Sequence, residues 1–194
     1  MKYDIIYCDP PWHYRVWTAK GGDWSASAHY KVMNTEDISS LPVSDIASKN
    51  CTLFLWATAP NLIDALNVIK SWGFTFKTIA FTWLKIYNNG KPVCGLGYYT
   101  RSSTELCLLA TKGKPKRINA NVYQAVLEPQ RKHSQKPDTV KERIVQLMGD
   151  LPRIELFARD VRREQDGWLH LGWEISNKDI RVELREIINN EERK

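Results

Sequence analysis

The chain lacks the features of three protein classes. None of its apolar runs approaches the roughly 18 residues that a membrane-spanning helix needs. Its first residues, Met1–Ile5, enter an apolar segment at once, without the layout of a signal peptide. Its four cysteines include no CxxC pair and no neighbouring histidine at metal-ligand spacing. We therefore expect a cytoplasmic protein with no membrane segment, no disulfide and no metal site.

The composition is that of an ordinary globular protein that carries excess positive charge. Of 194 residues, 43% are hydrophobic and 26% are charged, and the formal net charge is +6. Positive charge favours a polyanionic partner only where it surrounds a site. Some of the basic residues form two runs, Lys112–Arg117 and Arg131–Lys136. Such runs are usually solvated faces, but we favour a phosphate-contacting rim here.

Buried strands alternate with helices along the chain. The strands are expected at Tyr3–Cys8, Cys51–Ala57, Phe76–Ile86, Thr104–Thr111, Arg153–Ala158 and Trp168–Gly172. The helices are expected after the Asn34 cap, over Pro60–Trp72, from Lys136 to the stop at Gly149, and in the tail from Asn177. This order predicts an α/β domain with a largely parallel sheet and helices on both faces. We expect one domain over 1–194, with a core at 1–176 and a C-terminal helix at 177–194.

Two unusual segments follow predicted strands. Asp9-Pro10-Pro11-Trp12 comes after the first strand, and Ala158-Arg159-Asp160 comes at the end of the strand that begins at Arg153. Ligands of parallel α/β sheets bind beyond the carboxyl ends of the strands. The two segments therefore predict a shared site.

The tetrapeptide Asp9–Trp12 combines hydrogen-bond acceptors with an aromatic plate. The two prolines stiffen it, and Asp9 and the Pro10 carbonyl supply acceptors. Trp12 offers a flat face for stacking. This arrangement suits a planar ring with an exocyclic amine, whose lone pair two acceptors could aim at an electrophile. A proline-rich turn with Trp12 packed in the core is the other interpretation, and the tetrapeptide alone does not decide between them.

Four segments in this order resemble one known family. They are Asp9–Trp12, Tyr30–Met33, Ser134–Asp138 and Ile154–Arg159, and the resemblance runs from about Asp4 to Glu174. The family is the small adenine-N6 methyltransferases, typified by the catalytic subunit of the messenger-RNA adenosine methyltransferase, with short bacterial and phage members. The resemblance implies a Rossmann-like fold in which the catalytic motif precedes the cofactor motif. It also implies S-adenosyl-L-methionine as cofactor and S-adenosyl-L-homocysteine as product.

The resemblance also implies roles for individual residues. The catalytic set is Asp9, Pro10, Pro11 and Trp12. Substrate binding is assigned to Tyr30, Tyr14 and Lys132, and cofactor binding to Cys8, Asp9, Lys136, Glu155, Phe157, Arg159 and Glu174. The family's Gly-Asn-Glu/Gln segment is here Gly172-Trp173-Glu174, so Glu174 is expected to meet the cofactor ribose without the asparagine.

Several alternatives stay open on the sequence alone. DNA is favoured as substrate because compact single-domain members resemble bacterial and phage DNA methyltransferases, while RNA is the alternative. A non-catalytic nucleic-acid-binding subunit is a further alternative, although the intact tetrapeptide and Lys136 favour catalysis. Sequence preference would come from the loops His13–Met33 and Tyr87–Arg101 or from a second subunit, and a homodimer is one such arrangement.

Two features outside the tetrapeptide each have two interpretations. Glu105, at the start of a predicted strand, forms either a structural salt bridge or a contact that orders the active-site loop. Tyr98 and Tyr99, with Arg101 nearby, either stack on bases that flank the target or pack in the core.

Overall fold

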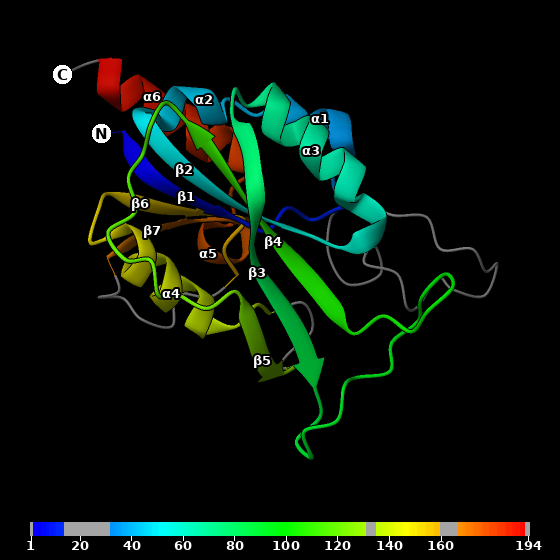
Figure 1. The fold of residues 1–194 in the computed structure, drawn as a ribbon. Coiled ribbons are helices and arrows are strands. Elements are labelled where there is room, and N and C mark those ends of the chain that lie inside the picture. Colours follow the sequence, from blue (N-terminus) through cyan, green and yellow to red (C-terminus); the bar gives the residue numbers. More distant parts are fainter. Residues whose placement is uncertain (1, 14–31, 131–134, 160–166, 193–194) are drawn as a thin grey trace.

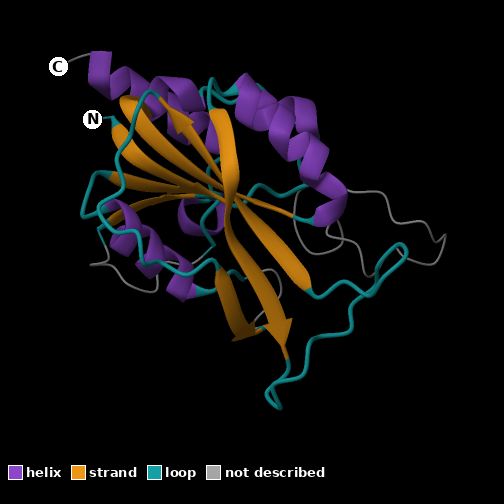
Figure 2. Cartoon of the chain, viewed as in Figure 1, coloured by secondary structure: helices purple, strands orange, loops and turns teal. Residues whose placement is uncertain are grey.

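The computed structural model describes residues 2–13, 32–130, 135–159 and 167–192. Seven strands form a single sheet that lies between two helical layers (Figure 1, Figure 2). The strands are β1 Tyr3–Cys8, β2 Ala47–Ala57, β3 Thr75–Ile86, β4 Thr104–Lys112, β5 Ala125–Pro129, β6 Arg153–Leu156 and β7 Trp168–Leu171. The helices are α1 Thr35–Ser39, α2 Val43–Ile46, η3 Ala59–Asn61, α3 Leu62–Ser71, α4 Asp138–Met148, α5 Trp173–Ser176 and α6 Ile180–Glu192.

The sheet has the order β5-β3-β4-β2-β1-β6-β7. The β1–β2, β1–β6, β6–β7 and β3–β5 pairs are parallel, and only β4 runs antiparallel to its two neighbours, β2 and β3. All the strands except β4 therefore end at the same edge of the sheet, which we call the carboxyl edge. The α/β class with a largely parallel sheet is confirmed.

Each face of the sheet carries its own apolar cluster, because successive strand residues point to opposite faces. In β1, Ile6 and Cys8 join the cluster under α1, α2, α3 and α6. Ile5 and Tyr7 join the cluster under α4. Figure 1 shows these helical layers on opposite sides of the strands. Helices on both faces were expected.

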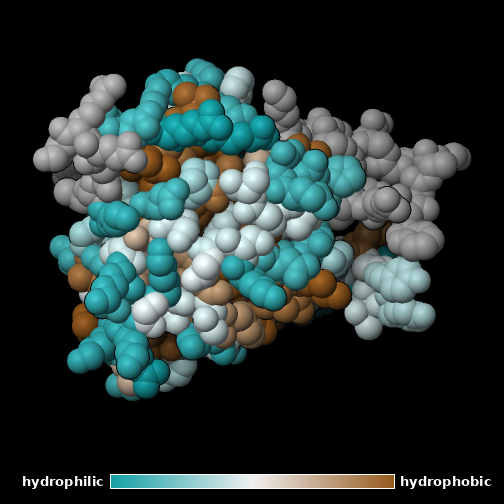
Figure 3. All heavy atoms as spheres, turned by 90° about the horizontal axis from the view of Figure 1, so that it is seen from above, coloured by the Kyte–Doolittle hydropathy of each residue, from teal (hydrophilic) through white to brown (hydrophobic). Residues whose placement is uncertain are grey.

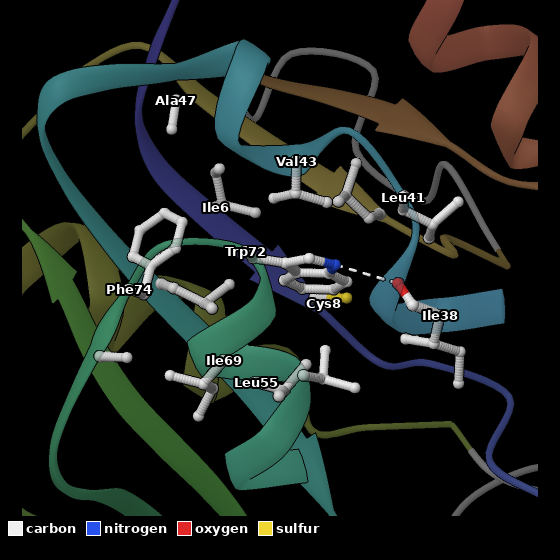
Figure 4. Close-up of a cluster of buried hydrophobic side chains, with 14 of the residues drawn as sticks. Ile6, Cys8, Ile38, Leu41, Val43, Ala47, Leu55, Ile69, Trp72 and Phe74 are labelled. Atoms are coloured by element: carbon white, nitrogen blue, oxygen red, sulfur yellow. Dashed lines mark hydrogen bonds between the residues drawn. The ribbon is translucent and has the colours of Figure 1, made fainter. Parts of the chain in front are cut away.

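The larger cluster ties its helices together by a buried indole. The Trp72 N–H, just after α3, donates to the Ile38 carbonyl of α1 at 3.0 Å (Figure 4). The outer surface of this layer carries hydrophilic residues with smaller hydrophobic areas between them (Figure 3). In the described part of the chain, no helix has the length and apolar character needed to cross a membrane.

Most element boundaries match the sequence-based expectations. The strand Tyr3–Cys8 and the stop of α4 at Gly149, whose φ is +95°, are as predicted. The Asn34 side chain caps α1 by accepting from the Asp37 N–H at 2.7 Å. β2 begins four residues earlier than predicted, at Ala47 instead of Cys51. Sequence reasoning missed the short elements α2, β5 and α5.

Candidate active site

The tetrapeptide Asp9–Trp12 leaves β1 at the carboxyl edge and is fixed mainly by backbone hydrogen bonds. The Asp9 N–H donates to the Leu156 carbonyl at 3.5 Å, and the Met33 N–H donates to the Pro11 carbonyl at 2.9 Å. The Trp12 N–H donates to the Pro10 carbonyl at 2.8 Å. This contact occupies one lone pair of the Pro10 carbonyl. A carbonyl oxygen has two lone pairs, and the second can still accept from a ligand.

Trp12 is buried. Its side chain belongs to the larger core cluster with an exposed fraction of 5%, and its indole N–H donates to the Trp56 carbonyl at 2.9 Å. This burial does not fit the open stacking face expected for Trp12. The indole instead anchors the tetrapeptide to the end of β2. For Trp12 the structure therefore agrees with the interpretation of a proline-rich turn packed in the core, while the acceptor role of Asp9 stays a prediction.

A chain of alternating charges runs from Asp9 along the carboxyl edge. The Lys136 ammonium lies 2.7 Å from an Asp9 carboxylate oxygen and 3.2 Å from Glu105. Glu105 also pairs with Lys85 near the end of β3. We call these four residues, Asp9, Lys136, Glu105 and Lys85, the charged chain. Its formal charges cancel, which is the condition for burying ionised groups.

Burial makes these pairs strong. The side chains of Lys136, Glu105 and Asp9 have exposed fractions of 9%, 13% and 18%. Burial alone would raise the pKa of Glu105, but Lys136 and Lys85 lower it to about 2. Burial likewise opposes the charge of Lys136, yet Asp9 and Glu105 raise the pKa of this ammonium above its ordinary value. Both groups are ionised at neutral pH.

Strand alternation explains why the charged chain lies on the α4 face. Phe81, Trp83 and Lys85 occupy every second position of β3 and therefore share one face of the sheet. Phe81 and Trp83 are buried there under α4. Trp83 pairs with Glu105 across β3 and β4. Lys85 lies 5.0 Å from the Trp83 ring centroid, a distance typical of cation–π contacts.

Trp56 of β2 joins the tetrapeptide to this face. Its backbone carbonyl receives the indole N–H of Trp12, and its own ring lies 5.6 Å from the Lys136 ammonium. The Trp56 indole N–H donates to the Tyr7 hydroxyl at 2.7 Å. The resulting site has a paired carboxylate, Asp9, above a buried aromatic floor.

The second predicted segment forms a tight turn at the end of β6. Phe157 has a φ of +62°, a left-handed backbone conformation that residues other than glycine rarely adopt. A Cβ at Gly172 would overlap the carbonyl oxygen of Ala158, so the start of α5 packs directly on this turn. Arg159 and Glu174 lie on these two segments, 4.0 Å apart. The structure thus brings Phe157, Arg159 and Glu174 together beyond β6 and β7.

Two other predicted cofactor residues have different surroundings. Glu155 of β6 pairs with Lys141 of α4 at 2.7 Å and lies 3.3 Å from the His170 ring. It belongs to an ion-pair cluster beneath α4, on the face that carries Tyr7. The side chain of Cys8 is fully buried, and burial raises the pKa of its thiol. The Cys8 side chain therefore belongs to the core, and its predicted contact with the cofactor stays a prediction.

The remaining predicted contacts divide into two groups. Tyr14, Tyr30 and Lys132 lie outside the described residues. The basic run Lys112–Arg117 begins where β4 ends, and because β4 is antiparallel, this is the edge opposite Asp9. Lys112 donates there to the Ser44 carbonyl at 2.9 Å. The prediction that this run lies near the site is wrong.

Sequence reasoning missed Lys85 and Trp56 and left the role of Glu105 open. Lys85 could have been found, because a lysine two residues after a buried tryptophan at a strand end points to the same face. The contact of Lys136 with Glu105 could not, because it joins the segment before α4 to a strand 31 positions earlier.

Comparison with known proteins agrees with this geometry. A model of the MT-A70 family matches residues 3–174. The type II methyltransferase M.MunI of Mycoplasma sp is 34% identical over an alignment that covers 93% of this chain and 81% of that protein. An N(6)-adenosine-methyltransferase MT-A70-like protein of Arabidopsis thaliana is 25% identical over 90% of this chain but only 24% of its own length. The N6-adenosine-methyltransferase non-catalytic subunit MTB of the same plant is 31% identical over 65% of this chain and 17% of that protein.

Proposed function

The chain belongs to the MT-A70 family, and from this membership and its site we propose that it is a DNA methyltransferase that places a methyl group on the N6 amine of adenine. The resemblance seen in the sequence is thereby confirmed at the level of the family. The observation that carries the proposal is the pairing of Asp9 with Lys136 at the carboxyl edge, 2.7 Å apart, directly after β1.

The tetrapeptide would hold the target amine. Asp9 and the Pro10 carbonyl would accept its two N–H bonds, with Pro10 using the lone pair that Trp12 does not occupy. The amine of adenine is a weak nucleophile because its lone pair is delocalised into the ring. Two fixed acceptors would orient that lone pair, and the Asp9 carboxylate would stabilise the positive charge that develops on nitrogen.

Lys136 and Glu105 are positioning residues in this scheme. The Lys136 ammonium holds one oxygen of Asp9, which leaves the other oxygen of the carboxylate to accept from the amine. Glu105 in turn holds Lys136, so that the ammonium has a partner whether or not Asp9 turns toward substrate.

The residues beyond β6 and β7 fit S-adenosyl-L-methionine. When bound, this cofactor supplies an activated methyl group on a cationic sulfur. Glu174, with an exposed fraction of 50%, could accept hydrogen bonds from ribose hydroxyls, and Arg159 and Lys136 carry charge that suits the cofactor carboxylate. The Phe157 turn would form one side of the cofactor site. Its positive φ fits this role, since strained backbone of this kind often occurs at ligand sites.

DNA is the substrate that the comparisons favour. The type II methyltransferase M.MunI is similar over most of both chains. The relatives named for adenosine methylation, including an RNA methyltransferase of Cryphonectria parasitica, are 25–31% identical and align over about half of their length or less. RNA is therefore the second candidate substrate. We expect the enzyme to act in the cytoplasm, alone or as a homodimer.

Similarity to the subunit MTB, whose name describes it as non-catalytic, supports the further alternative of a nucleic-acid-binding subunit. Incubation with labelled S-adenosyl-L-methionine and either DNA or RNA, in single- and double-stranded form, separates these candidates when the modified nucleoside is identified by mass spectrometry. We expect N6-methyladenine in DNA. Label only in N4-methylcytosine, or binding without any transfer, would overturn the proposal.

The Asp9→Ala variant tests the role of the tetrapeptide directly. It should abolish methyl transfer and leave nucleic-acid binding largely intact. Asp150→Asn is the matched control, because this carboxylate is 87% exposed, just before β6 at the opposite edge of the sheet. If Asp9→Ala retains more than about a hundredth of the wild-type rate, the assignment of Asp9 to the amine is wrong.

A further inference from the structure

The connection between β3 and β4 forms an arm of residues 87–103 that extends beyond the sheet (Figure 1). It begins two residues after Lys85 and ends two residues before Glu105, so both of its ends adjoin the charged chain. Its backbone is ordered by hydrogen bonds, among them Val93 N–H to the Lys85 carbonyl at 2.8 Å and Gly95 N–H to the Ser102 carbonyl at 3.0 Å. The arm therefore has a defined backbone conformation, and both of its ends adjoin residues of the candidate active site.

Two adjacent tyrosines lie in the tight turn between Gly97 and Thr100, which we call the tip of the arm. Tyr98 and Tyr99 have exposed fractions of 78% and 93%, and their rings meet edge to face with centroids 4.8 Å apart. A Cβ at Gly97 would overlap the Thr100 carbonyl oxygen, so the tip turns too tightly for any other residue at that position. The exposure removes the interpretation that these tyrosines pack in the core. Two largely exposed aromatic rings on an ordered support form a surface that a binding partner can contact.

The composition of the arm favours a nucleic acid as that partner. Residues 87–103 include Lys91 and Arg101 and no aspartate or glutamate. Phosphates attract positive charge, and bases stack on aromatic rings regardless of sequence. The ends of the arm point the same way, because they adjoin Lys85 and Glu105 of the charged chain, which the chain's proposed substrate must reach.

We propose, on the basis of the proposed function, that Tyr98 and Tyr99 form a wedge that enters double-stranded DNA and occupies the gap left by the adenine that is methylated. An enzyme that reacts at this amine must extrude the base from a duplex, which costs stacking and pairing energy. An aromatic side chain in the vacated stack recovers part of that energy. A single-stranded substrate has no such gap, so the wedge assists methylation of duplex DNA selectively.

The test compares the Tyr98→Ala/Tyr99→Ala double variant with wild type on one plasmid sequence, as native duplex and as single-stranded circles. The kcat/KM for methyl transfer to the duplex should fall about tenfold or more, while that for the single strand changes less than about threefold. Tyr123→Ala is the matched control, because this tyrosine is 82% exposed but lies outside the arm. It should leave both rates unchanged. Thermal melting checks that each variant is folded.

A binding assay decides the proposal independently of methylation. Fluorescence anisotropy with a labelled duplex should show that wild type binds a duplex with one abasic site more tightly than the intact duplex, by about fivefold or more. The double variant should lose this preference. If the wild type transfers no methyl group, the proposed function is wrong. The preference for the abasic duplex still decides whether the tyrosines act as a wedge.

Three results would overturn the wedge. The first is an equal loss of kcat/KM by the double variant on duplex and single strand, and the second is an unchanged preference for the abasic duplex. The third is a change in oligomeric state measured by sedimentation velocity. If the wild-type chain self-associates and the double variant does not, the tyrosines contact a second copy of the chain instead of DNA.

Discussion

At the scale of single residues, the site depends on charge balance. Lys136 lies between two carboxylates, Asp9 and Glu105, and Glu105 lies between two ammonium groups. Removing one member of such a buried chain leaves an unpaired charge, which costs more than the pair itself contributes. Glu105 therefore forms the structural salt bridge that was one of its two interpretations, and this salt bridge includes Lys136 of the candidate site.

Glu105→Gln tests this balance through its pH dependence. The pKa of Glu105 is lowered from an ordinary 4.5 to about 2 in the folded protein, so the carboxylate adds stability above about pH 5 and loses it as the pH falls toward 2. The variant should unfold about 3 kcal/mol more easily at pH 7. Its difference from wild type should shrink steadily below pH 5. Urea denaturation across this pH range measures both effects.

The exposed pair of Lys178 with Glu186 supplies the control for that experiment. The Glu186 carboxylate is 51% exposed, and such pairs contribute little. Glu186→Gln should change the stability by less than about 0.5 kcal/mol at any pH. A Glu105→Gln difference that is independent of pH would contradict the assigned ion pairs.

Trp12→Phe tests whether the buried indole positions the tetrapeptide. The change removes the hydrogen bond to the Trp56 carbonyl and some packing, and should cost about 1–2 kcal/mol in urea denaturation. Trp72→Phe is matched to it, since that indole also donates to a buried carbonyl, at 3.0 Å, but this carbonyl belongs to Ile38 of α1 and not to a residue of the candidate site. Both variants should lose similar stability, and only Trp12→Phe should lower kcat. An equal kcat for the two would restrict Trp12 to a role in stability.

At the scale of elements, hydrophobic pattern predicted most of the sheet. β1, β3 and β4 are continuous apolar or alternating runs with clear ends, and α3 and α4 end at Gly73 and Gly149 as such helices should. The missed elements are short, and they form through tertiary contacts. β5 is a five-residue edge strand that exists because it pairs with the last residues of β3.

The site was predictable only where it is local in sequence. The tetrapeptide follows a recognisable strand, so its place at the carboxyl edge could be expected. The antiparallel direction of β4 could not be read from its apolar residues. That direction brings Glu105 to Lys136, and it also carries the basic run Lys112–Arg117 to the far edge.

Gly172→Ala tests how closely α5 must approach the Phe157 turn. The added methyl group would overlap the Ala158 carbonyl oxygen and would separate the Ala158 N–H from the Leu171 carbonyl, now 2.8 Å away. We expect a loss of about 2 kcal/mol in stability and weaker binding of S-adenosyl-L-homocysteine in calorimetry. Gly90→Ala is the comparison: a Cβ there meets nothing within 4 Å, but the φ of +79° is unfavourable for alanine, so this variant should lose stability without weaker binding of S-adenosyl-L-homocysteine. Equal affinities in the two variants would remove the Gly172 contact from the cofactor site.

At the scale of the whole molecule, the sheet separates two basic regions. The arm with Lys91 and Arg101 lies beyond the carboxyl edge, and the exposed residues Lys114, Lys116 and Arg117 follow β4 at the opposite edge. The net charge of +6 therefore does not describe the binding surface by itself. Only charges close to bound phosphates release counterions on binding, so salt dependence reports which region meets the nucleic acid.

Two sets of neutralised variants distinguish the regions. The measured quantity is the slope of log affinity for duplex DNA against log salt concentration. The Lys91→Gln/Arg101→Gln variant should reduce the magnitude of this slope by about one for each phosphate that a replaced cation had neutralised, and so by up to about two. Lys114→Gln/Lys116→Gln/Arg117→Gln removes more charge from the chain and should leave the slope unchanged. Titrations by fluorescence anisotropy at several salt concentrations measure both. If the triple variant lowers the slope and the double variant does not, the nucleic acid lies along the edge opposite Asp9, and the arm could not act as the wedge.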